Sequence, residues 1–267
     1  MPSPHKRKPK EKAGSKKHPL DRTIFYTDHK ITTNDGKVLK IRNIGLAHGV
    51  YLTLPKNKQK AINSLTPKGS TVISEGSPKH FLPEHLATRF APQHHSEAVS
   101  ADLAEEMIGK KNLLILSSIN LPIALSSEIG ARFRPVKIVN GQIGKKQLAK
   151  VNDSRALRPF ISKKYKPEDT AFFVTPGRSA LMASDLLAAK DYEIKEPLVS
   201  VSGIAHSHQI ARFLENPKLH YRYLKKLKAK VDAGRIPDTS NKELSDLISH
   251  RLRVIEGIHK KESWIKT

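Results

Sequence analysis

Short apolar runs bounded by turn-forming residues recur along the chain and predict β-strands. Residues 23–27 and 38–44 form two such runs, and the turn sequence Asn-Asp-Gly at 34–36 lies between them. This arrangement is typical of a β-hairpin. Two further runs, at 71–74 and 198–202, are short and consist almost wholly of apolar or small residues, as expected of buried strands.

Apolar residues spaced three or four positions apart predict helices between and after these strands. Residues 54–65 form the first, so the chain from 38 to 74 predicts a strand–helix–strand unit with two neighbouring parallel strands. A later helix is expected to begin at Thr175 and Pro176, because threonine is a good N-cap and proline suits the first turn. The other expected helices are 83–90, 97–111, 113–129, 207–215, 218–230 and 241–260, and residues 134–144 predict a second hairpin.

The alternation of strand and helix patterns predicts one α/β domain. We expect a mixed, largely parallel sheet flanked by helices, built from two related halves that face each other across a central cleft. The domain is expected to span residues 21–263. Residues 1–20 are expected to form a disordered basic arm, because they are rich in lysine and lack apolar residues spaced for packing.

The charge of the chain favours anionic partners. Lysine and arginine number 48 against 25 aspartates and glutamates, which gives a formal net charge of +23 over 267 residues. We expect such a partner to bind at the basic arm and at the amphipathic segment 218–230, and a merely solvated surface is the alternative. The basic residues of this segment are Lys218, Arg222, Lys225, Lys226, Lys228 and Lys230.

The cysteine content limits the possible metal ligands, and the hydropathy limits where in the cell the protein is expected. The chain has no cysteine, so any metal site must use histidine, carboxylate or water. No apolar core follows the basic N-terminus, as a secretory signal would require. The most apolar stretch, 113–125, is shorter than the roughly 18–20 residues of a membrane span. We therefore expect a cytoplasmic protein with no membrane span. The sequence is compatible with a monomer and with a homodimer.

One short motif occurs twice, each time at the end of a predicted strand. Gly45 is followed by His48, and Gly203 by His206, both as Gly-x-x-His. A glycine in such a turn lets backbone or ligand approach closely, and the histidine is then held at the edge of the sheet. Neutral imidazoles from separate strands are natural ligands of a divalent metal, although a single histidine in this position is more often hydrogen-bonded within the fold.

Glu75 and Arg178 are the charged residues that we expect beside these histidines. Glu75 follows a buried strand, at the carboxyl edge where ligands bind in open α/β sheets, and its carboxylate needs a metal, an arginine or a backbone N–H. It is a candidate metal ligand, general base or capping residue. Arg178 is expected in the first turn of its helix, against the helix dipole, which suggests an anionic partner such as Glu75 or a developing oxyanion.

Together these residues resemble the TraB/PrgY family, which is related to the Tiki metalloproteases and to the erythromycin esterase/ChaN-like proteins. The resemblance is carried, in order, by Gly-Leu-Ala-His at 45–48, Ile-Ser-Glu-Gly at 73–76, Gly-Arg-Ser-Ala-Leu-Met at 177–182 and Gly-Ile-Ala-His at 203–206. The chain differs from the usual pattern at Leu46, where threonine or serine is common, and at Ser179, where an acidic residue often follows the arginine.

This resemblance implies a metal-dependent hydrolase of the metalloprotease type, with a peptide or a small molecule as substrate. It implies His48, Glu75 and His206 as ligands of a divalent ion such as Mn²⁺, Co²⁺ or Zn²⁺. It also implies Glu75 as the base and Arg178 as the residue that stabilises the oxyanion. The alternative is a protein without catalysis that binds a signal molecule or nucleic acid.

Overall fold

The computed structural model describes residues 23–46, 56–75, 89–93, 103, 106–107, 137–140, 164–191, 194, 196–238, 242–260 and 262–265. Several expectations from the sequence fall wholly or mostly outside these ranges. They concern the basic arm at 1–20, the first motif histidine His48, and the helices expected at 83–90, 97–111 and 113–129.

Six strands form one mixed sheet in the order β4-β3-β6-β2-β1-β5. The strands are β1 (Thr23–Thr32), β2 (Val38–Leu46), β3 (Thr71–Ser74), β4 (Arg89–Gln93), β5 (Lys137–Asn140) and β6 (Leu198–Gly203). The expected hairpin joins β1 and β2, and Gly36 in its turn has a φ of +81°. The other strand pairs of this sheet are parallel, which confirms the prediction of a mixed, largely parallel α/β sheet.

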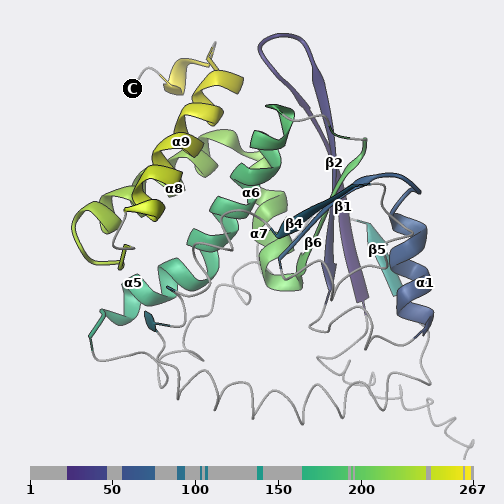
Figure 1. The fold of residues 1–267 in the computed structure, drawn as a ribbon, viewed down its shortest axis with the longest axis horizontal. Coiled ribbons are helices and arrows are strands. Elements are labelled where there is room, and N and C mark those ends of the chain that lie inside the picture. The colour runs from purple at the N-terminus through teal and green to yellow at the C-terminus, as the bar shows by residue number, and fades with distance from the viewer. Residues whose placement is uncertain are drawn as a thin grey trace, which may run out of the picture.

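Helices cover both faces of the sheet, with α1 (Lys56–Leu65) on one side and the later helices on the other (Figure 1). The later helices are α5 (Pro167–Phe172), α6 (Arg178–Ala188), α7 (Ile204–Glu215), α8 (Pro217–Asp232) and α9 (Glu243–Ile258). Single turns at Ala189–Asp191 (η6) and Ser263–Ile265 (η7) follow α6 and α9. Among the helices in the described ranges, none has the length and apolar character needed to cross a lipid bilayer.

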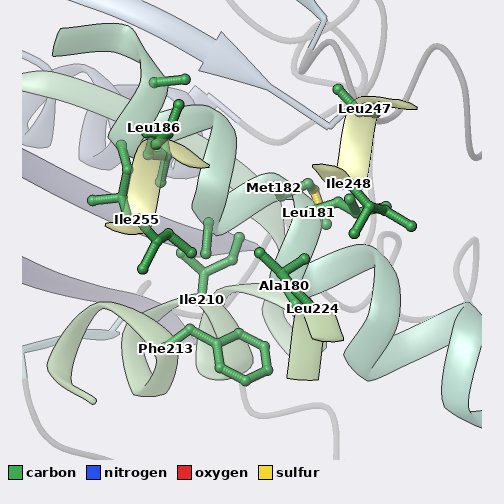
Figure 2. Packing of buried hydrophobic residues seen from close by; sticks show 14 of the residues in the cluster. Ala180, Leu181, Met182, Leu186, Ile210, Phe213, Leu224, Leu247, Ile248 and Ile255 are labelled. Atoms are coloured by element: carbon green, nitrogen blue, oxygen red, sulfur yellow. The ribbon is translucent and has the colours of Figure 1, made fainter. Parts of the chain in front are cut away.

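Alternate residues of the central strands pack into two separate cores. On β2, Ile41 packs into the larger cluster with the later helices, whereas Ile44 packs with Ile62 of α1. Figure 2 shows part of the larger cluster, where side chains from α6, α7, α8 and α9 gather. The central strands β3 and β6 are therefore buried on both faces, which leaves their carboxyl ends as the places where polar groups can reach a ligand.

The strand order differs from the expectation in a way that matters for the site. The strand–helix–strand unit predicted β2 and β3 as neighbours, but β6 lies between them and pairs in parallel with both. The two strands that carry the Gly-x-x-His motifs, β2 and β6, are therefore hydrogen-bonded neighbours in one sheet. The further prediction of two related halves facing each other across a cleft is not tested by this pairing and stays a prediction.

The helix expected to begin at Pro176 begins instead at Pro167. α5 continues through a π-helical turn, Phe173–Gly177 (η5), into α6, and Gly177 keeps helical φ and ψ of −64° and −52°. Proline has no N–H and would interrupt an α-helical ladder, and the wider π turn accommodates that interruption. Arg178 therefore lies within a continuous helical segment, so the argument from the helix dipole was wrong.

Two smaller expectations were also wrong, and a third is tested only in part. Residues 89–90, expected at the end of a helix, belong to β4. The helix expected to begin at 207 begins at Ile204, which places His206 in its first turn. Residues 137–140 form β5, which pairs in parallel with β1, and the rest of the hairpin expected at 134–144 lies outside the described ranges, so that hairpin stays a prediction.

Candidate functional site

The carboxyl ends of β3 and β6 bring together three charged or ionisable side chains. Glu75 directly follows β3, and its backbone N–H donates a hydrogen bond of 3.0 Å to the carbonyl oxygen of Val201 on β6. His206 lies in the first turn of α7, which follows β6 without a loop. Arg178 opens α6, which packs against α7. Three elements distant in sequence thus meet at one edge of the sheet.

The Glu75 carboxylate is the common partner in this cluster. Its Oε2 accepts a hydrogen bond of 2.6 Å from the backbone N–H of Gly203. Its Oε1 lies 3.5 Å from Nε2 of His206 and 3.7 Å from Nη2 of Arg178. The side chains of Glu75, Arg178 and His206 are 23%, 15% and 12% exposed, so the cluster is shielded but reachable from solvent. Charges in such a setting interact more strongly than they do in water.

Gly203 allows the Glu75 carboxylate to approach its backbone closely. A Cβ at this position would lie 3.2 Å from Glu75 Oε2, so the carboxylate would have to shift by a few tenths of an ångström. The N–H of Gly203 is at the N-terminus of α7, where the helix dipole favours a negative charge. The carboxylate therefore caps α7 from a different strand, and this fixes the direction in which Oε1 points.

Gly45, the glycine of the first motif, serves a different purpose. A Cβ on Gly45 would lie 2.8 Å from the Cβ of Ser207 and 3.3 Å from the Cα of Ile204, both on α7. A Cβ contact of 2.8 Å essentially never occurs and one of 3.3 Å is tight, so a larger residue would push α7 away from β2. Gly45 thus allows α7 to lie directly against the sheet, and so supports the position of His206.

Buried hydrogen bonds anchor the first turn of α7 to the neighbouring strands. The hydroxyl of Ser207 donates to the carbonyl oxygen of Ile44 at 3.0 Å and is 2.8 Å from the hydroxyl of Ser202. The side-chain amide of Asn43 donates to the carbonyl oxygen of Ser207 at 2.8 Å. Because all these polar groups are buried and paired with β2 and β6, the helix turn that carries His206 is held in one position.

Ser179 is a residue of the site that sequence reasoning missed. Its Oγ lies 2.8 Å from Nδ1 of His206, and its side chain is fully buried. The two ring nitrogens of His206 therefore face Ser179 on one side and Glu75 on the other. One signal in the sequence could have pointed to it. Ser179 follows Arg178, at the position where the family that the chain resembles often has an acidic residue.

His208, two residues after His206, lies away from the cluster. Its ring lies 4.3 Å from the ring of Phe25 on β1, centroid to centroid. Burial lowers the pKa of His208 to about 4, so it is neutral at pH 7. The ring packs against β1, two residues along α7 from the histidine that faces Glu75.

The donors in the described ranges are compatible with a divalent ion but do not complete a site. Two ligands on one tetrahedral ion, each bonded at roughly 2.1 Å, are separated by about 3.4 Å. The 3.5 Å between Glu75 Oε1 and His206 Nε2 matches this spacing and is long for a direct hydrogen bond. Within those ranges no group of three histidine or acidic side chains comes together, and His48 lies outside them.

Comparison of the chain with models of protein families, with curated proteins and with solved structures finds no match. The site is therefore interpreted from its own residues and distances.

Proposed function

We propose that this chain is a metal-dependent hydrolase that acts on a peptide or on a small ester or amide, and that Glu75, His206 and Arg178 belong to its active site. The observation that carries the proposal is the position of Glu75 Oε1, 3.5 Å from His206 Nε2 and 3.7 Å from Arg178 Nη2. The cluster lies at the carboxyl edge of parallel strands, where α/β sheets commonly bind ligands. The resemblance to the TraB/PrgY family supports the same assignment.

His206 and Glu75 would hold the ion, and His48 would be the third ligand. Mn²⁺, Co²⁺ and Zn²⁺ all accept imidazole and carboxylate ligands. A divalent ion at such a site lowers the pKa of water towards about 7, and so supplies a nucleophile at neutral pH. The 3.5 Å spacing of the two described donors supports this role.

Each neighbouring residue would have its own task in the reaction. The N–H of Gly203 holds Glu75 Oε2, so that Oε1 is directed towards the site, where it would act either as a ligand of the ion or as the base that takes a proton from the attacking water. The guanidinium of Arg178 would stabilise the negative oxygen that forms on the substrate carbonyl. Ser179 would keep the His206 ring oriented, and its burial excludes it as the group that attacks the substrate.

A second candidate function uses the same residues without catalysis. The Glu75 carboxylate has the guanidinium of Arg178 nearby and accepts a hydrogen bond from the backbone N–H of Gly203. These are partners that a shielded carboxylate requires. The cluster could therefore bind a polar signal molecule in place of an ion. A measurement of metal binding distinguishes the hydrolase from the binding protein.

Thermal denaturation with added Mn²⁺, Co²⁺ or Zn²⁺ tests the proposal, together with metal analysis of the purified chain. An ion that binds only the folded state raises Tm, by an amount that depends on its concentration relative to Kd. We expect a rise in the wild type that is lost in His206→Ala and in Glu75→Gln. His250→Ala is the matched control, since His250 is an exposed histidine on α9.

Loss of the rise in both site variants, with retention in the control, would justify a screen of peptide and ester substrates. Arg178→Ala should then lower kcat by about 10²–10³-fold, as expected for the loss of an oxyanion donor. An equal rise in Tm in all variants, or no rise in any, would reject the metal site and favour the binding function.

A further inference from the structure

Helix α8 presents a row of positive charges that the proposed hydrolase does not use. Four of its basic side chains are exposed, and at 3.6 residues per turn they occupy an arc of about 100° along the helix. The buried residues of α8, among them Leu224 and Leu227, lie on the opposite side. We define the exposed row as the α8 stripe, which consists of Lys218, Arg222, Lys225 and Lys226.

Nearby carboxylates neutralise other cations and leave the α8 stripe charged. Lys228 pairs with Asp232 at 2.7 Å, and both Lys230 and Arg235 pair with the buried carboxylate of Asp169. In the part of the chain that the structure describes, no carboxylate forms an ion pair with a stripe residue. The stripe is therefore available to an external anion.

Aromatic rings hold two of the stripe lysines in place. Nζ of Lys225 lies 5.4 Å from the ring centre of Tyr221, and Nζ of Lys226 lies 4.9 Å from that of Phe172 on α5. The hydroxyl of Tyr221 in turn donates to Glu256 of α9 at 2.6 Å. Cation–π contacts at exposed positions contribute about 0.5–1 kcal/mol each, so these ammonium groups lose less freedom when they bind an anion.

The apolar side chains around the stripe distinguish between two kinds of polyanion. A helix that binds an acidic membrane inserts an apolar face into the lipid. The apolar residues of α8 face the core, and the large hydrophobic side chains exposed within the described ranges are Val38 and Ile138, on β2 and β5. We infer that the α8 stripe binds the phosphate backbone of nucleic acid, an interaction that requires cations and no apolar insertion.

Fluorescence anisotropy with the full chain tests this inference. The probes are a labelled DNA duplex and a labelled RNA single strand, each about 20 nucleotides long, titrated at several salt concentrations. The test variant is Lys218→Gln/Arg222→Gln/Lys225→Gln. The matched control is Lys56→Gln/Lys60→Gln/Lys68→Gln, which removes the same charge from exposed lysines on and beside α1, across the sheet.

We expect the wild type to bind with an affinity that falls steeply as salt rises. If each stripe residue neutralises one phosphate, the slope of log K against log salt on duplex should decrease by about 2–3 in the stripe variant. The control should retain most of the affinity and of the slope. The metal-dependent rise in Tm should be the same in both variants, because the α8 stripe is separate from the Glu75 cluster.

Three results would overturn the inference. One is absence of nucleic-acid binding by the wild type, and another is an equal loss of affinity in the stripe variant and the control. The third is binding to vesicles of phosphatidylserine and phosphatidylcholine that depends on the stripe, without binding to nucleic acid. That last result would assign the stripe to a membrane surface.

Discussion

The hydroxyl of Ser179 lies 2.8 Å from Nδ1 of His206 and joins α6 to α7 at the edge of the sheet. The neighbouring residue on α6, Arg178, contacts the same cluster through Glu75 at 3.7 Å. Two consecutive residues of α6 therefore contact two different members of the site. If Nδ1 carries the ring proton and donates it to Ser179, the lone pair of Nε2 faces Glu75, which is the arrangement that a metal ligand needs.

Replacement of Ser179 should weaken metal binding without a matching loss of stability. Loss of a hydrogen bond that orients a ligating histidine typically reduces metal affinity by about 10–100-fold. We expect Ser179→Ala to raise the Kd for Zn²⁺ or Mn²⁺ in this range, measured by isothermal titration calorimetry. The matched control is Ser184→Ala, since Ser184 is also fully buried on α6 but donates to Leu181 of its own helix at 2.6 Å.

Nitrogen NMR of the histidine side chains gives a readout that is independent of metal affinity. The wild type should show a protonated Nδ1 on neutral His206, and Ser179→Ala should shift this tautomer balance while Ser184→Ala should not. Equal metal affinity in Ser179→Ala and the wild type, or equal weakening in both serine variants, would contradict an orienting role for Ser179.

The two motif glycines should respond differently to alanine. In Gly45→Ala the new Cβ meets Ser207 at 2.8 Å and the backbone of Ile204 at 3.3 Å, so we expect a loss of about 1–3 kcal/mol in the free energy of unfolding. In Gly203→Ala the new Cβ meets only side-chain atoms, chiefly Glu75 Oε2 at 3.2 Å, which can move. This variant should stay closer to wild-type stability but lose metal binding.

Urea denaturation and metal titration of both glycine variants check this pair of expectations. A larger loss of stability in Gly203→Ala than in Gly45→Ala would show that the roles are assigned the wrong way round. Retention of full metal binding in Gly203→Ala would show that the Gly203 N–H does not fix the Glu75 carboxylate.

Replacement of only one partner of the buried ion pair between α6 and α9 should strongly reduce the free energy of unfolding. Nη2 of Arg251 lies 3.0 Å from Oδ1 of Asp185, and the two side chains are 9% and 5% exposed. Arg251→Met leaves the carboxylate buried without its cation, which should reduce the free energy of unfolding by about 3–5 kcal/mol. The double variant Asp185→Leu/Arg251→Met should recover most of this loss, and failure to recover it would show that the pair contributes more than charge balance.

Buried His220 should make stability depend on pH below neutrality. Its Nε2 donates to the carbonyl oxygen of Ala180 at 2.7 Å, and burial lowers the pKa of His220 to about 4 from 6.5. Between these two values the unfolded chain binds a proton that the folded chain does not. Stability should therefore fall as pH decreases from about 6.5 to 4, by up to about 3 kcal/mol for this residue.

Urea denaturation at several pH values checks this expectation, with His220→Leu as the comparison. The variant should show a shallower decrease over the same range, and part of the decrease should remain because burial also lowers the pKa of His208 to about 4. An identical pH dependence in the variant and the wild type would contradict the assignment to His220.

The sequence predicted the parts of the site that local pattern determines. Glu75 and His206 follow buried strands, and the apolar runs at β3 and β6 locate those strands to within a residue or two. It could not predict that β6 lies between β2 and β3, because strand order depends on long-range pairing. Nor could it predict the partner of Ser179, since the π turn around Pro176 changes which residues of α6 face α7.

The local sequence pattern also could not predict the directions in which the side chains of His206 and His208 point. The motif selected His206, but the expected helix start at 207 left its side-chain direction open, whereas the actual start at Ile204 places His206 and His208 two positions apart on one helix. Residues two apart on an α-helix point to different sides, so His206 faces Glu75 and His208 faces Phe25.

Anomalous X-ray scattering from crystals grown with Mn²⁺ or Zn²⁺ tests the central claim most directly. The account predicts one strong anomalous peak for an ion that binds Nε2 of His206 and Oε1 of Glu75, at roughly 2.0–2.2 Å from each atom for Zn²⁺. His48 should be the third ligand of the same ion. A peak elsewhere, or no peak beside Glu75 in crystals that contain the ion, would contradict the metal site and leave the cluster as a binding site without a metal.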